Sequence, residues 1–204
     1  MGVYEDRVLP HLVQLTCGGS EMERWRARAT DGLHGEVLEI GFGSGLNLPV
    51  YPDAVTKVWG VEPNLRAREM ATERMAAAPF PVELVGLDGQ AVPLPDGTCD
   101  GALATFTLCT IPDPALALDE VRRVLRPGGT LHLLEHGASP DPSVATWQRR
   151  FEPLQRKLAG GCHLTRDPVE LAEAAGFTVE EVDRRYAKGP KPWSWFTVAR
   201  VRAA

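Results

Sequence analysis

The sequence predicts an α/β protein built on a doubly wound, mostly parallel sheet with an antiparallel pair of strands at its C-terminal end. Short runs rich in Val, Leu and Ile alternate with helical patterns along most of the chain. A turn with three glycines follows the first of these runs, and the last two runs are separated by a loop only. Strands that alternate with helices imply right-handed crossovers and parallel pairing, whereas two strands joined by a loop can pair antiparallel.

Composition restricts the class of protein. The chain has 204 residues, of which 44% are hydrophobic and 24% charged, and its formal net charge is -5. This acidic balance argues against a nucleic-acid partner, since such binding needs a basic surface. The four cysteines form no CxxC pair, the N-terminus carries acids early, and no apolar run approaches the roughly 18 residues of a membrane span. We therefore expect a cytoplasmic protein without a signal peptide, a disulfide framework or a membrane span.

The N-terminal part reads as two amphipathic helices ahead of the sheet, over Tyr4–Thr16 and Glu21–Thr30. Apolar residues recur at helical spacing in the first of them, at Tyr4, Val8, Leu12 and Leu15. Such a stripe can pack into the protein core, or it can cover a binding site as a lid. We divide the chain into N-terminal helices (1–34), the candidate lid, and a main domain (35–204). The strands expected at the start of that domain cover 36–40, 57–62, 82–86, 101–106 and 130–135.

Local signals define the helices between these strands. Asn64 is a good N-cap for a helix that runs to the breaker at Pro79, and Asp113 with Pro114 begins a second helix that ends before Pro127-Gly128-Gly129. A short helix follows Asp167, which forms a capping-box pattern with Glu170. The stretches "FTVEEVDRRYA" and "WSWFTVARVRA" then read as the closing pair of strands.

The turn after the first strand reads "EIGFGSGLN", with glycines at Gly41, Gly43 and Gly45. A dinucleotide fingerprint would require Gly or Ala at position 46, where this chain has Leu46. Glu39, just before the first glycine, would repel a pyrophosphate but not a sulfonium or an amino group. The turn therefore favours a positively charged nucleoside ligand over a dinucleotide.

Two further carboxylates follow neighbouring strands. Glu62, next to Pro63, ends the second strand, where a carboxylate can accept hydrogen bonds from both ribose hydroxyls. Asp88 follows the third strand, where it can accept from an adenine amino group while the backbone from Gly89 reads the edge of the ring.

The glycine turn, Glu62, Asp88 and "VRRVLRPGGTL", in this order, resemble the class I S-adenosylmethionine-dependent methyltransferases. The resemblance covers roughly Glu21 to the C-terminus. It implies a seven-stranded Rossmann-like sheet, S-adenosylmethionine as cofactor and S-adenosylhomocysteine as product. The cofactor-binding residues expected from it and from the motifs above are Glu39, Gly41, Gly43, Gly45, Asn47, Glu62, Pro63, Asp88, Gly89 and Thr105. Asn47 is equally suited to capping the next helix.

The acceptor should lie at the carboxyl ends of the fourth and fifth strands. The fourth ends in "ATFTLCTIPD", without the Asn/Asp-Pro-Pro-aromatic run of enzymes that methylate exocyclic amines of bases, so we set that substrate class aside and expect Phe106 to flank the substrate. His136 ends the fifth strand and is the candidate catalytic residue, as proton acceptor or as substrate contact. His132 shares its face of the strand, but no third ligand has matching spacing, so we predict no metal.

"LEHGA", a helix and then "GGCHLTRD" (160–167) resemble the small-molecule thiol methyltransferases called methyltransferase-like seven in animals, and their soluble bacterial relatives. The resemblance implies alkyl thiol acceptors and adds His163, Thr165 and Arg166 as substrate-binding candidates, although the loop also serves to end one helix and cap the next. Two features depart from it: the animal members begin with a membrane-embedded segment not seen here, and Glu62 stands where relatives carry Asp.

The predicted function is therefore methyl transfer from S-adenosylmethionine to a small molecule, with a thiol as the leading acceptor. Methylation of oxygen or nitrogen in another metabolite or a lipid headgroup stays open, as does a non-catalytic cofactor-binding module. A nicotinamide oxidoreductase is disfavoured by Leu46 and Glu39. The sequence does not distinguish a monomer from a dimer.

Overall fold

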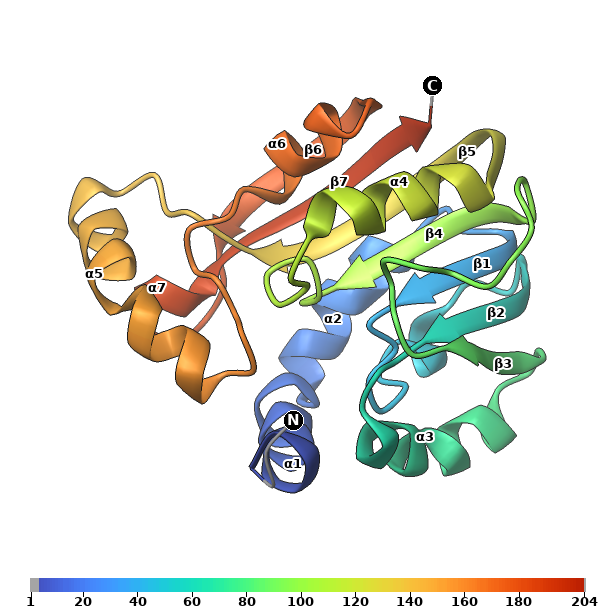
Figure 1. Cartoon of the computed structure of the whole chain (residues 1–204), viewed down its shortest axis with the longest axis horizontal. Coiled ribbons are helices and arrows are strands. Elements are labelled where there is room, and N and C mark those ends of the chain that lie inside the picture. Colours follow the sequence, from blue (N-terminus) through green and yellow to red (C-terminus); the bar gives the residue numbers. More distant parts are fainter. Residues whose placement is uncertain (1–3, 204) are drawn as a thin grey trace.

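A computed structural model describes residues 4–203, apart from the side chains of residues 5 and 6. It contains a seven-stranded sheet with strand order β3-β2-β1-β4-β5-β7-β6. All pairs from β3 to β5 are parallel, whereas β7 pairs antiparallel with both β5 and β6. In Figure 1 the arrowheads of β1, β4 and β5 point to one side and that of β7 to the other. The predicted fold class is confirmed, including the antiparallel end of the sheet.

The elements follow one another as the sequence predicted, with a helix or loop between each pair of strands. The strands are β1 (Gly35–Ile40), β2 (Val55–Val61), β3 (Val82–Gly86), β4 (Cys99–Thr105), β5 (Leu125–His136), β6 (Phe177–Tyr186) and β7 (Trp195–Ala203). The helices are η1 (Tyr4–Val8), α1 (Leu9–Cys17), α2 (Ser20–Thr30), η2 (Leu48–Val50), α3 (Leu65–Ala77), α4 (Pro114–Val124), α5 (Pro142–Leu158), α6 (Pro168–Ala174) and α7 (Lys191–Ser194).

The predicted caps begin the helices for the expected reason. The side chain of Asn64 accepts a hydrogen bond from the backbone N–H of Ala67 at the start of α3. Asp113 and Asp167 accept from two backbone N–H groups each, at the starts of α4 and α6. These bonds satisfy donors that have no partner within the first turn of a helix.

Three details differ from the sequence expectation. The helix after Asp113 ends at Val124, and Pro127, Gly128 and Gly129 lie within the long strand β5 rather than before it. The first helix is divided at Leu9, close to Pro10, which lacks the N–H that a continuous helix would need. A four-residue helix, α7, interrupts the loop between the last two strands. The first two differences concern element boundaries, whereas α7 is an element that the sequence prediction did not contain.

Two apolar layers cover the two faces of the sheet, and together they hold the strands in place. One layer joins the strands to α4 and α6 through Leu118, Val121 and Ala172. The other joins them to α2 and α3 through Trp25, Ala29 and Ala71. Figure 1 shows α4 and α6 on one side of the sheet and α2 on the other.

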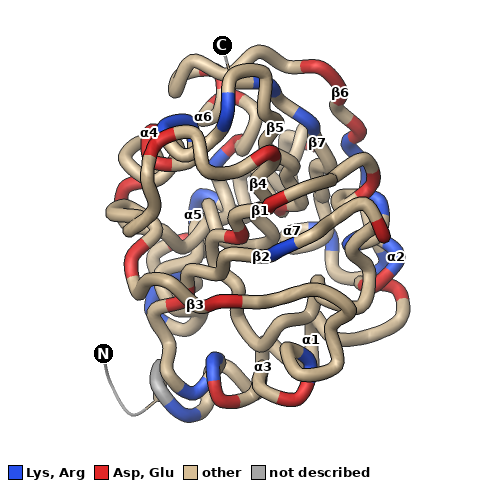
Figure 2. The backbone as a smooth tube through the Cα atoms, turned by 90° about the vertical axis from the view of Figure 1, so that its right-hand side faces the viewer, with Lys and Arg blue, Asp and Glu red and all other residues tan. Residues whose placement is uncertain are grey.

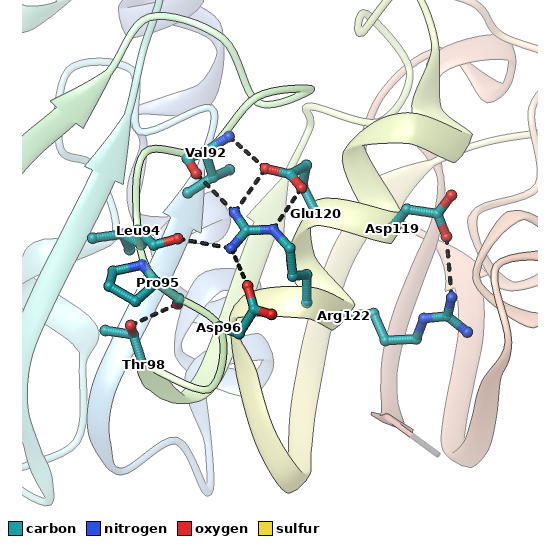
Figure 3. A network of polar contacts seen from close by, with 9 residues as sticks. Val92, Leu94, Pro95, Asp96, Thr98, Asp119, Glu120 and Arg122 are labelled. Atoms are coloured by element: carbon teal, nitrogen blue, oxygen red, sulfur yellow. Dashed lines mark hydrogen bonds and ion pairs between the residues drawn. The ribbon is translucent and has the colours of Figure 1, made fainter.

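The segment between β3 and β4 is tied to α4 by a single guanidinium. Arg123 donates to the carbonyl groups of Val92 and Leu94 and to the carboxylates of Asp96 and Glu120 (Figure 3). This planar fork of donors suits four acceptors at once. The network fixes the course of the chain as it enters β4.

Charge is spread over the molecule. Basic and acidic residues are interspersed in the view of Figure 2, and neither sign gathers on one face of it. Among residues 4–203, no helix has the length and apolarity needed to cross a membrane.

Candidate cofactor and acceptor site

The predicted site residues lie at the carboxyl ends of the parallel strands. Strands β1, β2, β4 and β5 end at Ile40, Val61, Thr105 and His136, respectively. A hollow of about 620 Å³ lies at the opposite edge, lined by residues that include Asp100, Arg126 and Arg202. The charged side chains there pair with one another, Arg126 with Asp100 and Arg202 with Glu180. Ligands of open α/β sheets bind outside the carboxyl ends of the strands. The candidate site is therefore at the carboxyl edge of the sheet, where the glycine loop follows β1.

The glycine loop turns sharply above the end of β1. The backbone N–H groups of Gly41 and Phe42 both donate to the carbonyl of Val61 at the end of β2. Gly41 and Gly43 adopt positive φ angles of 70° and 58°. A Cβ at Gly41 would collide with Thr107, whereas a Cβ at Gly43 would meet only a backbone oxygen, 3.9 Å away. Gly41 is thus needed by the fold, and Gly43 faces open space that a ligand can approach closely.

Glu62 closes the loop from the neighbouring strand. Its two carboxylate oxygens accept hydrogen bonds from the backbone N–H groups of Gly43, at 2.7 Å, and Asn64, at 2.8 Å. Burial raises the pKa of Glu62 and the two backbone bonds oppose that shift. Each oxygen has a second acceptor position, which leaves the carboxylate able to accept from ribose hydroxyls.

Glu39 lies beneath the loop in a buried polar network. Its oxygens accept from Asn47 Nδ2 at 2.7 Å and from the hydroxyl of Tyr51 at 2.6 Å. Arg26 of α2 in turn donates to Asn47 Oδ1 and to the hydroxyl of Thr105. Glu39 is completely buried, and desolvation raises its pKa to about 7 against the bonds from Tyr51 and Asn47. Three predicted cofactor residues, Glu39, Asn47 and Thr105, are therefore joined below the glycine loop.

The adenine side of the predicted site is more open. Asp88 is exposed and accepts hydrogen bonds from the backbone and side chain of Gln90, which lower its pKa. Gly89 lies within van der Waals distance of Ile40 and Ile111, as measured from an added Cβ, and Pro63 is exposed. These residues lie at the predicted strand ends.

Several buried polar atoms at this edge have no hydrogen-bond partner within the described part of the chain. They are Arg26 Nε, Glu135 Oε2 and His136 Nδ1. Buried polar groups are nearly always satisfied, so such atoms indicate a ligand or solvent at the site. Together with the open side of Gly43 and the carboxylate of Glu62, they fit a polar nucleoside cofactor.

Phe106 connects the cofactor side to the acceptor side. It has a φ of 53°, the one positive value for a non-glycine residue within 4–203, a strained conformation that persists only where the surrounding structure enforces it. The ring stacks on the imidazole of His136, with 6.3 Å between centroids. The Cζ atom of Arg26 lies 5.7 Å from the centroid of the same ring.

His136 lies beside two thiols. Its Nε2 is 3.1 Å from Cys162 Sγ, and one ligand-type atom from each of Cys109, His136 and Cys162 lies within 4.8 Å of the others. Hydrogen bonding from Cys109 and the contact with His136 lower the pKa of the Cys162 thiol, although burial opposes this. Burial works against protonation of His136, but Cys162 and Glu135 outweigh it and raise the pKa of the imidazole. His132, the other histidine on this strand, instead contacts the carbonyl of Ala29 at 2.8 Å.

The loop over 160–167 packs on the segment after β4. The N–H of His163 donates to the carbonyl of Cys109, and Arg166 donates to the carbonyls of Leu108 and Ile111. On the other side, Glu152 of α5 accepts from His163 Nδ1 and from the backbone N–H of Thr165. The predicted acceptor residues are brought together, and their polar atoms hold the loop in place.

The N-terminal helix α1 touches both sides of the site. Gln14 accepts a 2.5 Å hydrogen bond from Ser44 in the glycine loop, and Leu9 lies against Gly160. The apolar stripe expected on this helix is not part of the core: Val8, Leu12 and Leu15 are 44%, 42% and 80% exposed. The interpretation of this stripe as core packing is therefore wrong.

The sequence did not identify Arg26, Tyr51 and Cys109 as site residues. Arg26 occurs in the charged helix pattern "MERWRARAT", which reads as a solvated face although Arg26 is only 5% exposed. Tyr51 and Cys109 lie in loop segments without a motif. No local signal in the sequence distinguishes them.

Comparisons with known proteins agree with this geometry. Residues 38–133 match the family model described as "Methyltransferase domain". Thiol S-methyltransferase TMT1B of Homo sapiens is 36% identical over 173 residues, which cover 82% of this chain and 69% of that protein. Phosphatidylethanolamine N-methyltransferase of Cereibacter sphaeroides is 36% identical over 167 residues, covering 76% of this chain and 80% of that protein. This chain spans about two thirds of the length of the TMT1B relatives.

The fold is also found among solved structures. An S-adenosylmethionine-dependent methyltransferase from Thermotoga maritima superposes with a TM-score of 0.70 at 24% identity, covering 98% of each chain. Three observations indicate the same family. They are the strand order, the glycine loop with Glu62, and the relatives at 36% identity. The chain belongs to the S-adenosylmethionine-dependent methyltransferase family, and S-adenosylmethionine is its cofactor.

Proposed function

We propose that the protein transfers the methyl group of S-adenosylmethionine to the sulfur of a small-molecule thiol. The observation that carries this proposal is the similarity to thiol S-methyltransferases, which at 82% coverage includes both the glycine loop and the 160–167 loop. Support also comes from the aromatic and sulfur-rich surroundings of His136 at the acceptor edge, where Phe106, Cys109 and Cys162 lie.

The cofactor, when bound, supplies an electrophilic methyl group on a sulfonium. Glu62 accepts hydrogen bonds from the ribose, and the open side of Gly43 lets the ligand approach the backbone. The buried carboxyl group of Glu39 lies beneath the loop and holds Asn47 and Tyr51 by hydrogen bonds. The ring of Phe106 contacts both His136 and Arg26 and so joins this part of the site to the acceptor side.

The reaction is a displacement at carbon. The acceptor loses its proton, its sulfur forms a bond to the methyl carbon, and the bond between that carbon and the sulfonium sulfur breaks. The electron pair of the broken bond stays on the sulfur of S-adenosylhomocysteine. The protein mainly aligns the two sulfur atoms and excludes water. From the sequence, His136 is the candidate to take the proton of the acceptor.

A matched series of acceptors tests the choice of atom. Mercaptoethanol, ethanolamine and ethylene glycol share a two-carbon chain with one hydroxyl. They differ in the second group, which is a thiol, an amine or a hydroxyl. With purified protein and S-adenosylmethionine carrying a labelled methyl group, we expect methylated product from mercaptoethanol and little from the other two. Binding of S-adenosylhomocysteine, measured by calorimetry with a Kd in the micromolar range, is the control for a competent site. Methylation of the amine or the alcohol with none of the thiol would contradict the assignment.

A second acceptor class is favoured by one relative, the phosphatidylethanolamine N-methyltransferase at 36% identity. Vesicles that contain phosphatidylethanolamine belong in the same assay for this reason. Methyl transfer to these vesicles and to none of the small acceptors would show that the acceptor is a headgroup amine and not a thiol. Cofactor binding without transfer to any acceptor would instead indicate a non-catalytic cofactor-binding module.

A further inference from the structure

Three side chains that bind metals well meet at the carboxyl edge of the sheet. Cys109 follows β4, His136 ends β5, and Cys162 lies in the loop between α5 and α6. Their Sγ and ring nitrogen atoms all lie within 4.8 Å of one another, and Cys162 Sγ is 3.1 Å from His136 Nε2. We call this group the Cys-His-Cys cluster.

The donor atoms and their spacing suit Zn²⁺. Zinc binds thiolate sulfur at about 2.3 Å and imidazole nitrogen at about 2.0 Å, so two donors of one tetrahedral ion are about 3.5–3.8 Å apart. The separations in the cluster, from 3.1 Å to at most 4.8 Å, include this range. Soft sulfur ligands select zinc over magnesium or calcium.

Within the described part of the chain, no fourth protein ligand is grouped with these three. Structural zinc sites use four protein ligands, whereas catalytic zinc sites use three and keep a position for water or substrate. The cluster therefore has the composition of a catalytic site, with two cysteines and one histidine.

The three ligands are held before any ion binds. The carbonyl of Cys109 accepts from the N–H of His163, and Arg166 fixes the same segment through the carbonyl of Leu108. His136 is paired in register with Phe196 of β7. Cys109 and Cys162 are buried with Leu164 in a small apolar cluster. Rigid ligands lower the entropic cost of binding a metal.

The cluster is connected to the cofactor side by direct contacts. The ring of Phe106 stacks on His136, and the guanidinium of Arg26 lies over that ring. Arg26 also donates to Asn47, which follows the glycine loop. A ligand on the metal would thus lie on the side of the site where the methyl acceptor belongs.

We propose that Cys109, His136 and Cys162 bind one Zn²⁺ whose fourth position takes the acceptor thiol as a thiolate. This inference rests on the proposed function for its acceptor. On coordination the S–H bond breaks, the proton leaves to water, and the sulfur keeps the electron pair that later forms the bond to the methyl carbon. His136 Nε2 is then a ligand and not the proton acceptor expected from the sequence.

Metal content is the first test. After dialysis against Zn²⁺ and removal of excess ion, elemental analysis of the whole protein should find about one zinc per chain. Cys109→Ala, His136→Ala and Cys162→Ala should each weaken zinc binding by more than the roughly 10- to 100-fold that loss of an outer-shell partner costs. Cys17→Ser is the matched control, since Cys17 is a half-exposed thiol outside the cluster. Binding of S-adenosylhomocysteine shows that each variant is folded.

Cobalt substitution is the second test and needs no variant. Co²⁺ in a tetrahedral site with thiolate ligands gives sulfur-to-cobalt charge-transfer absorption and strong ligand-field bands. We expect these bands with the wild-type protein, and we expect mercaptoethanol, but not ethylene glycol, to change them. Cobalt bands that do not respond to the thiol would overturn the acceptor part of the inference, and absence of stoichiometric metal would overturn all of it.

The activity of metal-free protein separates this inference from the proposed function. If zinc supplies the thiolate, removing it should lower turnover of mercaptoethanol at neutral pH at least about tenfold, because a free thiol is mostly protonated there. Full thiol methylation by protein shown to be free of metal would overturn the zinc site and leave the proposed function standing. A thiol-responsive cobalt site without any methyl transfer to thiols would instead overturn the proposed function.

Discussion

Gly43 and Gly41 are neighbours in one loop, but their hydrogen atoms face different surroundings. A side chain at Gly41 would displace Thr107 from the core, whereas one at Gly43 would enter the space offered to the cofactor. The same residue type therefore serves folding at one position and binding at the other. This distinction can be tested by single substitutions.

We expect Gly43→Ala to lower the affinity for S-adenosylhomocysteine at least about tenfold while costing only about 1 kcal/mol of stability from the positive φ angle. Gly97→Ala is the matched control: its φ is 62°, no atom lies within 4 Å of an added Cβ, and it is remote from the glycine loop in the sequence. Calorimetry and thermal unfolding of both variants measure the two effects. Equal affinity in the two variants would show that no ligand approaches Gly43.

Glu62 is the second residue whose role can be isolated. Replacing it by Ala removes the acceptor of two backbone N–H groups and of the ribose hydroxyls, and charge-assisted bonds of this kind are the strong ones. We expect a loss of about 2–4 kcal/mol in binding S-adenosylhomocysteine, a rise in Kd of about 30- to 1,000-fold. Glu69→Ala, at an exposed acid on α3, is the control and should bind normally. Unchanged affinity of the Glu62 variant would mean that the cofactor lies elsewhere.

At the scale of elements, α1 is the segment most suited to move. None of its residues is buried, and it is attached through Gln14 to Ser44 and through Leu9 to Gly160. Segments with few buried contacts open at low cost, as lids must. We propose that α1 is the mobile part of the lid expected from the N-terminal helices, whereas α2 packs on the sheet.

The lid can be tested through its contact with the glycine loop. Gln14→Ala should leave the unfolding temperature nearly unchanged and should increase the dissociation rate of S-adenosylhomocysteine, because the helix is no longer tied to Ser44. Leu15→Ala on the same helix is the control, since that side chain is 80% exposed. Stopped-flow displacement of the ligand gives the rates. Identical rates in wild type and both variants would speak against a lid.

At the scale of the whole molecule, the buried carboxylate of Glu39 makes folding depend on pH. Desolvation raises the pKa of Glu39 from 4.5 to about 7, so the folded protein holds this proton more tightly than the unfolded chain. The contribution of this group to the free energy of unfolding is fully present below about pH 4.5, and it is lost as the pH rises to about 7. The full loss corresponds to about 3 kcal/mol.

We expect Glu39→Gln to remove this dependence, since the amide stays neutral and can still bond Asn47 and Tyr51. Urea unfolding between pH 5 and 7.5 should show the variant gaining stability relative to wild type by about 2–3 kcal/mol as the pH rises. Glu83→Gln, at an exposed acid on β3, should show no such trend. A difference between Glu39→Gln and wild type that stays constant across this range would contradict the assignment.

Much of the fold could be predicted from the sequence because its signals are local. The glycine loop, the caps at Asn64, Asp113 and Asp167, and the apolar runs each act within a few residues. Helix and strand boundaries were less accurate. At Leu125 the chain passes directly from α4 into β5, because pairing with Cys99 extends the strand further than the breakers at Pro127 and Gly128 suggest.

The sequence by itself determined the fold class, the cofactor loop and the strand ends at which Glu62 and His136 lie. Only the tertiary structure decided which side chains share one place. Arg26 from α2 reaches Asn47 and Thr105, and Cys162 reaches His136 across 26 residues of chain. No spacing rule reveals such pairs, because the crossovers of a parallel sheet bring distant segments to the same edge. Cys109 and Cys162, the two thiols proposed as zinc ligands beside His136, lie in two loops that are far apart in the sequence and that only folding joins.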